Sequence, residues 1–204
     1  MNRRTTFLFV LAGLLVAGAA LAADPPKAQE GSAHEQMSAD MQAMMKAATP
    51  GEQHKLVGRL VGDWTYTIQM YMAPGQPPVG SSGTMHADWL LGGRYVESVY
   101  KGDFMGQPFE GHGVNGYDNV QGKYVGTWID NAGTGIMNST GTCDAGCKSE
   151  TWSGDMFEPT SGQKISTTST VTWADDDHFK MEAFMPDGKG GSFKTMELSA
   201  TKKK

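Results

Sequence analysis

The sequence contains few charges, few cysteines and few long apolar runs. Charged residues make up 19% of its 204 positions, and the formal net charge is −5. Its one run of basic residues is Lys202-Lys203-Lys204. Nucleic acid is therefore not expected as a partner, because phosphate recognition needs a basic stripe or patch. Beyond residue 22 no apolar run approaches the about 20 residues of a spanning helix, so no transmembrane segment is predicted there.

The motifs of common catalytic and cofactor sites are absent too. We find no nucleophile elbow, phosphate-binding loop or zinc-hydrolase motif. Gly111-x-Gly113-x-x-Gly116 has the spacing of a dinucleotide fingerprint, but it lies within a strand pattern and opens no helix. The five His residues lack the spacing of zinc ligands. No motif indicates an enzyme, a metal site or a cofactor.

The first 22 residues have the three parts of a secretory signal peptide. Arg3 and Arg4 supply the positive charge, residues 7–20 are apolar, and Ala20-Leu21-Ala22 is an A-x-A cleavage site. We predict cleavage after residue 22 and a periplasmic or secreted protein. Residues 23–33 are rich in Pro, Ala, Gln and Gly, which predicts a flexible leader.

Residues 34–48 have a helical pattern that is rich in methionine. Met37, Met41, Met44 and Met45 are spaced so that they share one helix face. The preferred interpretation is an apolar stripe that packs on the domain, because Met adapts to irregular surfaces. The alternative is a copper(I) site, since thioether sulfur is a soft ligand.

Residues 49–204 are predicted to form one all-β domain. Thr49, Pro50 and Glu52 have the pattern of a helix start, and a short helix is expected to end at Gly62. From residue 63 onward, apolar and polar residues alternate with a period of two, and turn residues recur every eight to twelve positions. The predicted strands are 63–72, 81–90, 94–104, 108–117, 123–130, 134–143, 147–157, 163–174, 178–185 and 192–201.

These connections are too short for crossover helices, so neighbouring strands should pair antiparallel. We predict a single up-and-down β-barrel of about ten strands, preceded by one or two short helices. The register of 94–104 stays open, because Val96, Ser98 and Tyr100 compete with Tyr95, Glu97 and Val99 for the inner face.

Cys143 and Cys147 flank Asp144-Ala145-Gly146. A three-residue hairpin loop with Gly at its last position would place the two cysteines opposite each other on adjacent strands. An oxidising compartment then favours a structural disulfide. The alternative is a redox or copper-binding dithiol.

Gly62-Asp63-Trp64 resembles the Gly-x-Trp signature of lipocalins and the wider calycin group. The resemblance implies that Trp64 closes one barrel end and that a basic residue of the last strand, Lys202 or else Lys194, packs over it. A longer set of motifs resembles the bacterial family of domain of unknown function 1579. The set consists of Thr49-Pro50-Gly51-Glu52-x-His54-Lys55-Leu56, Gly62-Asp63-Trp64, Gly92-Gly93-Arg94-Tyr95, Gly116-Tyr117-Asp118-Asn119, Lys123 to Asp130 and Phe193 to Glu197.

This second resemblance implies a calycin-like barrel and brings no activity with it. Related haem-binding nitrobindin barrels place a His near the C-terminal strand, and residues 192–204 contain none. Haem is therefore not expected in that manner.

Ten strands leave room for a cavity, whereas eight can be filled by their own side chains. The function we predict is binding of a small hydrophobic or amphipathic ligand inside the barrel. The alternative is an envelope structural or interaction protein with a filled barrel. The candidate ligand-binding residues are Trp64, Tyr66, Trp89, Arg94, Glu97, Tyr117 and Trp128.

Overall fold

The computed structural model describes residues 28–158 and 161–204, with side chains from residue 38 onward. The predicted signal peptide and residues 23–27 lie outside this range. The chain divides after Met41 into two compact units, and the second, Gln42–Lys204, contains the barrel. Within the described residues, no helix combines the length and the apolar character needed to cross a membrane.

Three helices precede the strands. They are α1 (Ala28–Ala48), α2 (Glu52–Val57) and the 3-10 helix η1 (Gly58–Leu60). The helix predicted over 34–48 thus starts at Ala28, and residues 28–33, predicted as a leader, form its first turns. Ala28, Gln29 and Glu30 are good helix formers, which accounts for the earlier start.

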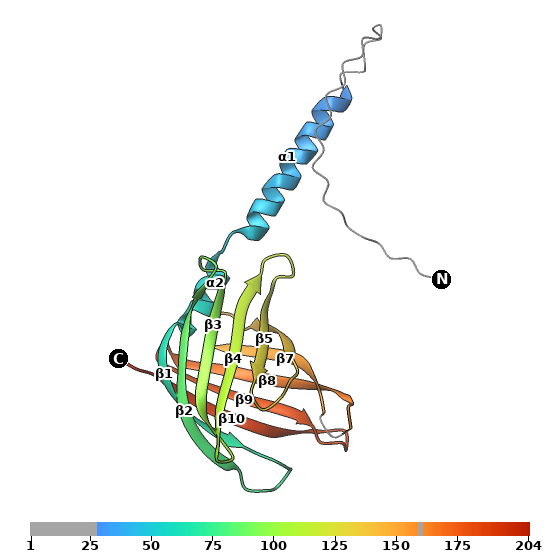
Figure 1. Cartoon of the computed structure of the whole chain (residues 1–204). Helices are drawn as coiled ribbons and strands as arrows, with labels where there is room; N and C mark the ends of the chain where they lie inside the picture. The colour runs from blue at the N-terminus through green and yellow to red at the C-terminus, as the bar shows by residue number, and fades with distance from the viewer. Residues whose placement is uncertain (1–27, 159–160) are drawn as a thin grey trace. The chain divides into compact units, whose positions relative to one another are not determined.

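Ten strands close into one antiparallel barrel, which confirms the predicted fold class (Figure 1). Each strand pairs with its neighbours in the chain, and β1 pairs with β10 to close the barrel, with Trp64 opposite Lys202. The strands are β1 (Gly62–Met70), β2 (Val79–Leu90), β3 (Tyr95–Phe104), β4 (Gln107–Asp118), β5 (Lys123–Asp130), β6 (Met137–Cys143), β7 (Ser149–Phe157), β8 (Lys164–Asp175), β9 (His178–Pro186) and β10 (Ser192–Lys202).

Strand pairing decides the register of β3. Val96 and Ser98 are 0% and 1% exposed, so the even-numbered residues of this strand face inward. Paired residues of adjacent strands share a face, so Tyr100 faces inward with its partners Met85 and Gly111. Tyr95, Glu97 and Val99 face outward.

One end of the barrel is closed by α2 and η1. His54 and Val57 of α2 are buried, and Leu56, Leu60 and Val61 pack against the barrel core. The predicted start of this helix is corrected by two residues, because Gly51 is the N-cap. The Gly51 N–H donates to Nδ1 of His54 at 3.0 Å, whereas the Thr49 hydroxyl donates to the Met45 carbonyl at the end of α1.

The predicted disulfide joins Cys143 and Cys147, whose Cα atoms are 4.9 Å apart. The cysteines are not opposite each other on adjacent strands, because β7 begins only at Ser149 and Cys143 pairs with Glu150. Cys147 lies in the connection, which is held by the Asp144 carboxylate accepting from the N–H groups of Lys148 and Ser149. Gly146 has the predicted left-handed conformation, with φ 97°.

Candidate functional site

The candidate site is the barrel lumen, defined by the side chains that face inward. The register of the ten strand pairs determines which side chains face inward. The inward side chains of β1 are Trp64, Tyr66, Ile68 and Met70, in order from the closed end of the barrel to the opposite end. The same order holds along β9, where Phe179, Met181, Ala183 and Met185 face inward.

The half of the lumen near α2 and η1, the closed half, is packed solid. Ten of its inward side chains are at most 6% exposed: Trp64, Tyr66, Met85, Ala87, Val96, Tyr124, Trp173, Phe179, Leu198 and Ala200. Trp64 makes edge-on contacts with Phe179 and Trp173, with ring centroids 5.2 Å and 6.2 Å apart. Its indole N–H donates to the Leu60 carbonyl at 2.7 Å, which attaches η1 to β1.

The basic residue implied by the Gly-x-Trp signature is Lys202. Its Nζ lies 5.1 Å from the centroid of the Trp64 ring and donates to the Arg59 carbonyl. Lys194, the alternative, instead lies over the ring of Tyr71.

A buried ion pair completes the closed half. Glu150 accepts hydrogen bonds from the Arg59 guanidinium at 3.2 Å and from the indole N–H groups of Trp152 and Trp173, each at 2.9 Å. Arg59 also lies 4.3 Å above the Trp173 ring. The side chains of Arg59 and Glu150 are each 15% exposed. This arrangement satisfies the inward carboxylate and ties η1 to β7 and β8.

Glycines let the larger aromatic side chains lie flat on the barrel wall. An added β-carbon would lie 2.4 Å from the Trp128 ring at Gly111 and 2.6 Å from the Trp152 ring at Gly141. At Gly83 it would lie 2.5 Å from the Tyr66 hydroxyl oxygen. Each ring therefore occupies the space above a glycine on a neighbouring strand.

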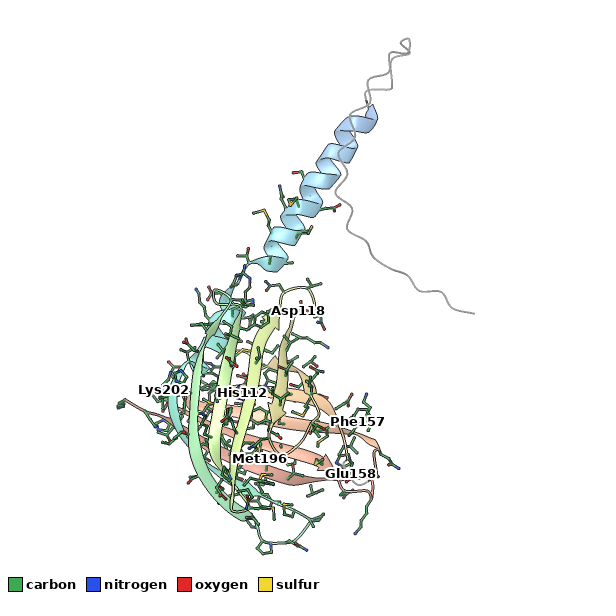
Figure 2. The ribbon with its side chains drawn as sticks, viewed as in Figure 1. His112, Asp118, Phe157, Glu158, Met196 and Lys202 are labelled. Carbon is green, nitrogen blue, oxygen red and sulfur yellow. A yellow bond between two sulfur atoms is a disulfide. The ribbon has the colours of Figure 1, made fainter. Side chains whose placement is uncertain are left out.

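In the other half, the open half, the inward side chains are only partly buried. They include apolar residues of eight strands: Ile68, Met70, Phe104, Phe109, Met137, Met156, Ile165, Met181, Met185, Phe193 and Met196. Figure 2 labels Met196 among the side chains of this half. Since the alternation with outward polar residues continues here, these side chains face the lumen and still meet solvent.

Exposed apolar side chains also mark the strand ends and connections at the open half. Met72 and Val79 flank the β1–β2 connection, and Met105 lies between β3 and β4. Ile136 precedes β6 and Phe157 ends β7. Their exposed fractions run from 44% at Val79 to 69% at Phe157. The rim of the lumen is therefore apolar on four of its five connections.

The structure places the seven candidate residues in different environments. Tyr66 and Trp128 both face inward, Tyr66 buried in the closed half and Trp128 only partly buried. Trp64 is 0% exposed and belongs to the sealed end. Trp89 is 38% exposed and covers Gly58 of η1, so it packs on the outside of the closure.

Of the three polar candidates, Tyr117 faces inward at the closed end, where its ring centroid lies 5.1 Å from that of Tyr124, whereas Arg94 and Glu97 lie away from the lumen. Arg94 and Tyr117 line a separate pocket of about 320 Å³ beside His54 at the closed end. Arg94 donates to the carbonyls of Leu91 and Ala48, so it caps the end of α1. Glu97 faces outward, 3.5 Å from Nδ1 of His112, whose other ring nitrogen lies 3.1 Å from Glu110. The expectation that Glu97 points into the barrel is wrong, because inward positions of β3 are even-numbered.

Several lumen residues are not among the candidates predicted from the sequence. Tyr100 was missed because the register of its strand was ambiguous, and Trp152 because its partner Gly141 lies on another strand. Met181 and Met185 belong to a regular alternation that indicated their face but not their exposure. For the open half, the sequence therefore indicates only which side chains share a face, through the alternation of apolar and polar residues.

Two methionines of α1, Met44 and Met45, belong to the same compact unit as the barrel and do not pack against it. They are 67% and 64% exposed. The preferred interpretation of a packed stripe is therefore wrong for these two residues, and the Met37 side chain lies outside the described range. Among the described residues, no group of three or more His, Cys, Asp or Glu side chains has a metal-binding arrangement.

Residues 49–202 match a family described as "Protein of unknown function (DUF1579)". The chain belongs to the DUF1579 family. The match spans the whole barrel, so the resemblance of the motifs at Gly62-Asp63-Trp64 and Gly92 to Tyr95 is confirmed. No curated protein matches the sequence.

Among solved structures, the DUF1579 barrel is similar to the crystal structure of Rv2717c from M. tuberculosis. The TM-score is 0.58 at 11% identity, over 76% of this chain and 100% of that one. A redesigned β-barrel, b11L5F_LGL, gives a TM-score of 0.38 at 15% identity over 72% and 95% of the two chains. EF1p2_mFAP2b bound to DFHBI gives 0.36 at 14% identity over 74% and 100%. The first of these supports the barrel fold alone.

Proposed function

We propose that this DUF1579 protein is an exported carrier that holds a small apolar or amphipathic molecule in the open half of its lumen. The observation that carries the proposal is the contrast along single strands. On β1, Trp64 and Tyr66 are buried, whereas Ile68 and Met70 face the same way and remain partly exposed. Apolar surface that stays accessible inside a barrel gains free energy when an apolar ligand covers it.

The wall glycines support the same proposal. A barrel filled by its own side chains would project its large aromatics toward the axis. Here Trp128 and Trp152 lie against Gly111 and Gly141 instead, which keeps their volume at the wall. The alternative of an interaction protein with a filled barrel requires a dry, fully packed interior, and the part-exposed side chains of the open half do not support it.

The exported location also belongs to the proposal. A disulfide between Cys143 and Cys147 persists in oxidising compartments and is rare in reducing ones. It therefore agrees with the signal peptide predicted over residues 1–22.

Binding of the neutral dye N-phenyl-1-naphthylamine tests the carrier proposal. Its fluorescence should rise on addition of the protein and saturate at one site. Ser169→Trp fills the lumen, because Ser169 faces inward opposite Trp152 and Ala183, and should abolish the signal. Thr168→Trp on the outer face of the same strand is the matched control and should bind normally. Equal binding by both variants, or no binding by the wild type, would refute the proposal.

A further inference from the structure

The lumen contains a short polar strip made of Ser98, Tyr100 and Asn115. All three face inward: Ser98 and Tyr100 follow each other on the inner face of β3, and Asn115 is paired with Val96 on the adjacent strand β4. The strip lies where the closed half gives way to the open half. Ser98 is 1% exposed, whereas Tyr100 and Asn115 are partly buried.

None of these side chains has a protein partner among the described residues. The Ser98 hydroxyl oxygen is buried without a hydrogen bond. The Tyr100 hydroxyl and the Asn115 amide make no hydrogen bond to another described residue. Buried polar groups in proteins are nearly always paired, so the Ser98 hydroxyl indicates a missing partner, and the part-exposed Tyr100 hydroxyl and Asn115 amide beside it are open to the same ligand.

The Tyr100 ring is fixed although its hydroxyl is unpaired. Its centroid lies 5.7 Å from that of Tyr66 and 5.3 Å from that of Trp128. Burial raises the pKa of the Tyr100 hydroxyl, and the neighbouring Tyr66 adds to the rise. The hydroxyl therefore stays neutral and can both donate and accept a hydrogen bond.

Charged side chains on the inner face are already engaged. In the described strands they are Glu150, Lys202 and Asp130. Glu150 and Lys202 are held at the closed end by Arg59 and Trp64, as described above. Asp130 accepts from the Trp128 indole and the Ala132 N–H at the open rim. An anionic group on a ligand would thus find no free cation on the inner face of the described strands, and a cationic group would find only Asp130, whose two carboxylate oxygens already accept hydrogen bonds. Burial of a charge at the polar strip is therefore costly.

We propose that the lumen selects amphipathic molecules whose polar group is uncharged, such as a hydroxyl or a carbonyl, and that the polar strip binds this group. The apolar remainder of the ligand then lies along the methionines and phenylalanines of the open half. This inference rests on the proposed carrier function and names the class of ligand.

Displacement of bound N-phenyl-1-naphthylamine by three ten-carbon probes tests it. The probes are 1-decanol, decanoate and decyltrimethylammonium, used with the full chain at pH 8 and below their micelle-forming concentrations. 1-Decanol should displace the dye at concentrations about tenfold or more lower than either ion. Tyr100→Phe keeps the ring and removes the hydroxyl, so it should weaken 1-decanol by about fivefold while dye binding is unchanged.

Ser98→Ala separates a binding role from a structural one. Removing a buried, unpaired hydroxyl should raise the unfolding midpoint of the free protein, and the same change should weaken 1-decanol. Thr127→Ala, which removes an exposed hydroxyl on the outer face of β5, is the control and should change neither.

The outcomes distinguish the two proposals. If the dye does not bind, or binds to Ser169→Trp as well as to wild type, the carrier function itself fails. If the dye binds in the lumen but decanoate displaces it as well as 1-decanol does, the selection of an uncharged group is refuted. Undiminished 1-decanol binding by Tyr100→Phe and Ser98→Ala together would refute the role of the polar strip.

Discussion

Gly141 of β6 lies directly beneath the indole of Trp152 on β7. All three of the heavy atoms nearest to a β-carbon at Gly141 belong to that ring, at 2.6 to 2.9 Å. Trp152 is also held by its hydrogen bond to Glu150. The ring therefore has no room to yield toward the wall and can move only toward the lumen.

Gly141→Ala should destabilise the protein by about 1–3 kcal/mol, because the added methyl group pushes Trp152 off the wall and away from Glu150. It should also weaken dye binding, since the displaced ring enters the lumen. Urea unfolding and dye titration measure the two effects. Gly133→Ala is the control, as nothing lies within 4 Å of its added β-carbon. Equal unfolding midpoints for the two variants would contradict the wall arrangement.

Truncation of Glu150 tests the ion pair at the closed end. Glu150→Ala leaves the Arg59 guanidinium and two indole N–H groups unpaired in a mostly buried site, and should cost about 3–5 kcal/mol of stability. Glu52→Ala removes an exposed ion pair with Lys55 and should leave the urea midpoint unchanged. A small effect of Glu150→Ala would mean that water satisfies these donors in solution.

Strand pairing explains how much of this structure the sequence predicts. The strands and their order follow from alternation and from short connections, and ten were expected. Which face of β3 is buried does not follow, because Glu97 and Ser98 compete until the partners on β2 and β4 are known. For the same reason the sequence indicated Tyr66 and Trp128 as lining residues but placed Glu97 on the wrong face.

The glycine–aromatic contacts explain the rest of what was missed. Trp152 and Gly141 are eleven residues apart and belong to different strands, so no local pattern joins them. Arg94 was chosen for its charge, yet it caps α1, because the carbonyls of Ala48 and Leu91 come within its reach only in the folded protein. The chemical type of a side chain can be taken from the sequence, whereas the groups that it contacts are determined only when the barrel closes.

Two histidines should give the stability opposite dependences on pH. Burial lowers the pKa of His54 below its ordinary value, so the unfolded chain binds its proton more readily. The contribution of His54 is therefore present above about pH 6.5 and is lost as the pH falls below that value. Hydrogen bonds that the His112 ring donates to Glu110 and Glu97 raise the pKa of His112, so its contribution is present below about pH 6.5 and is lost as the pH rises through the raised pKa.

Urea unfolding between pH 5 and pH 8 measures this difference. His54→Gln should lose less stability on acidification than wild type, and its side-chain carbonyl can still accept from the Gly51 N–H. His112→Gln should lose more than wild type on acidification. If both variants follow the wild-type curve, neither histidine contributes to the pH dependence.

Removal of the disulfide should affect stability and leave ligand binding intact. The double substitution Cys143→Ala and Cys147→Ala opens a very short loop, so about 2 kcal/mol is expected from chain entropy. Cys147 is also 3.5 Å from the Tyr124 hydroxyl, which donates to Gln53 of α2, so the change acts at the closed end. A loss of dye binding at a pH and temperature where the variant stays folded would contradict this separation of the two halves.

The pairing of β1 with β10 has a consequence for the order of events in the cell. The strand that begins the barrel finds its last partner only when Thr201 and Lys202 are available, more than 130 residues after Trp64. A chain in which β10 has not yet been synthesised cannot form this seam. Contacts so distant in sequence also form slowly. Closure of the barrel therefore waits for β10, whereas each hairpin between neighbouring strands can form before it.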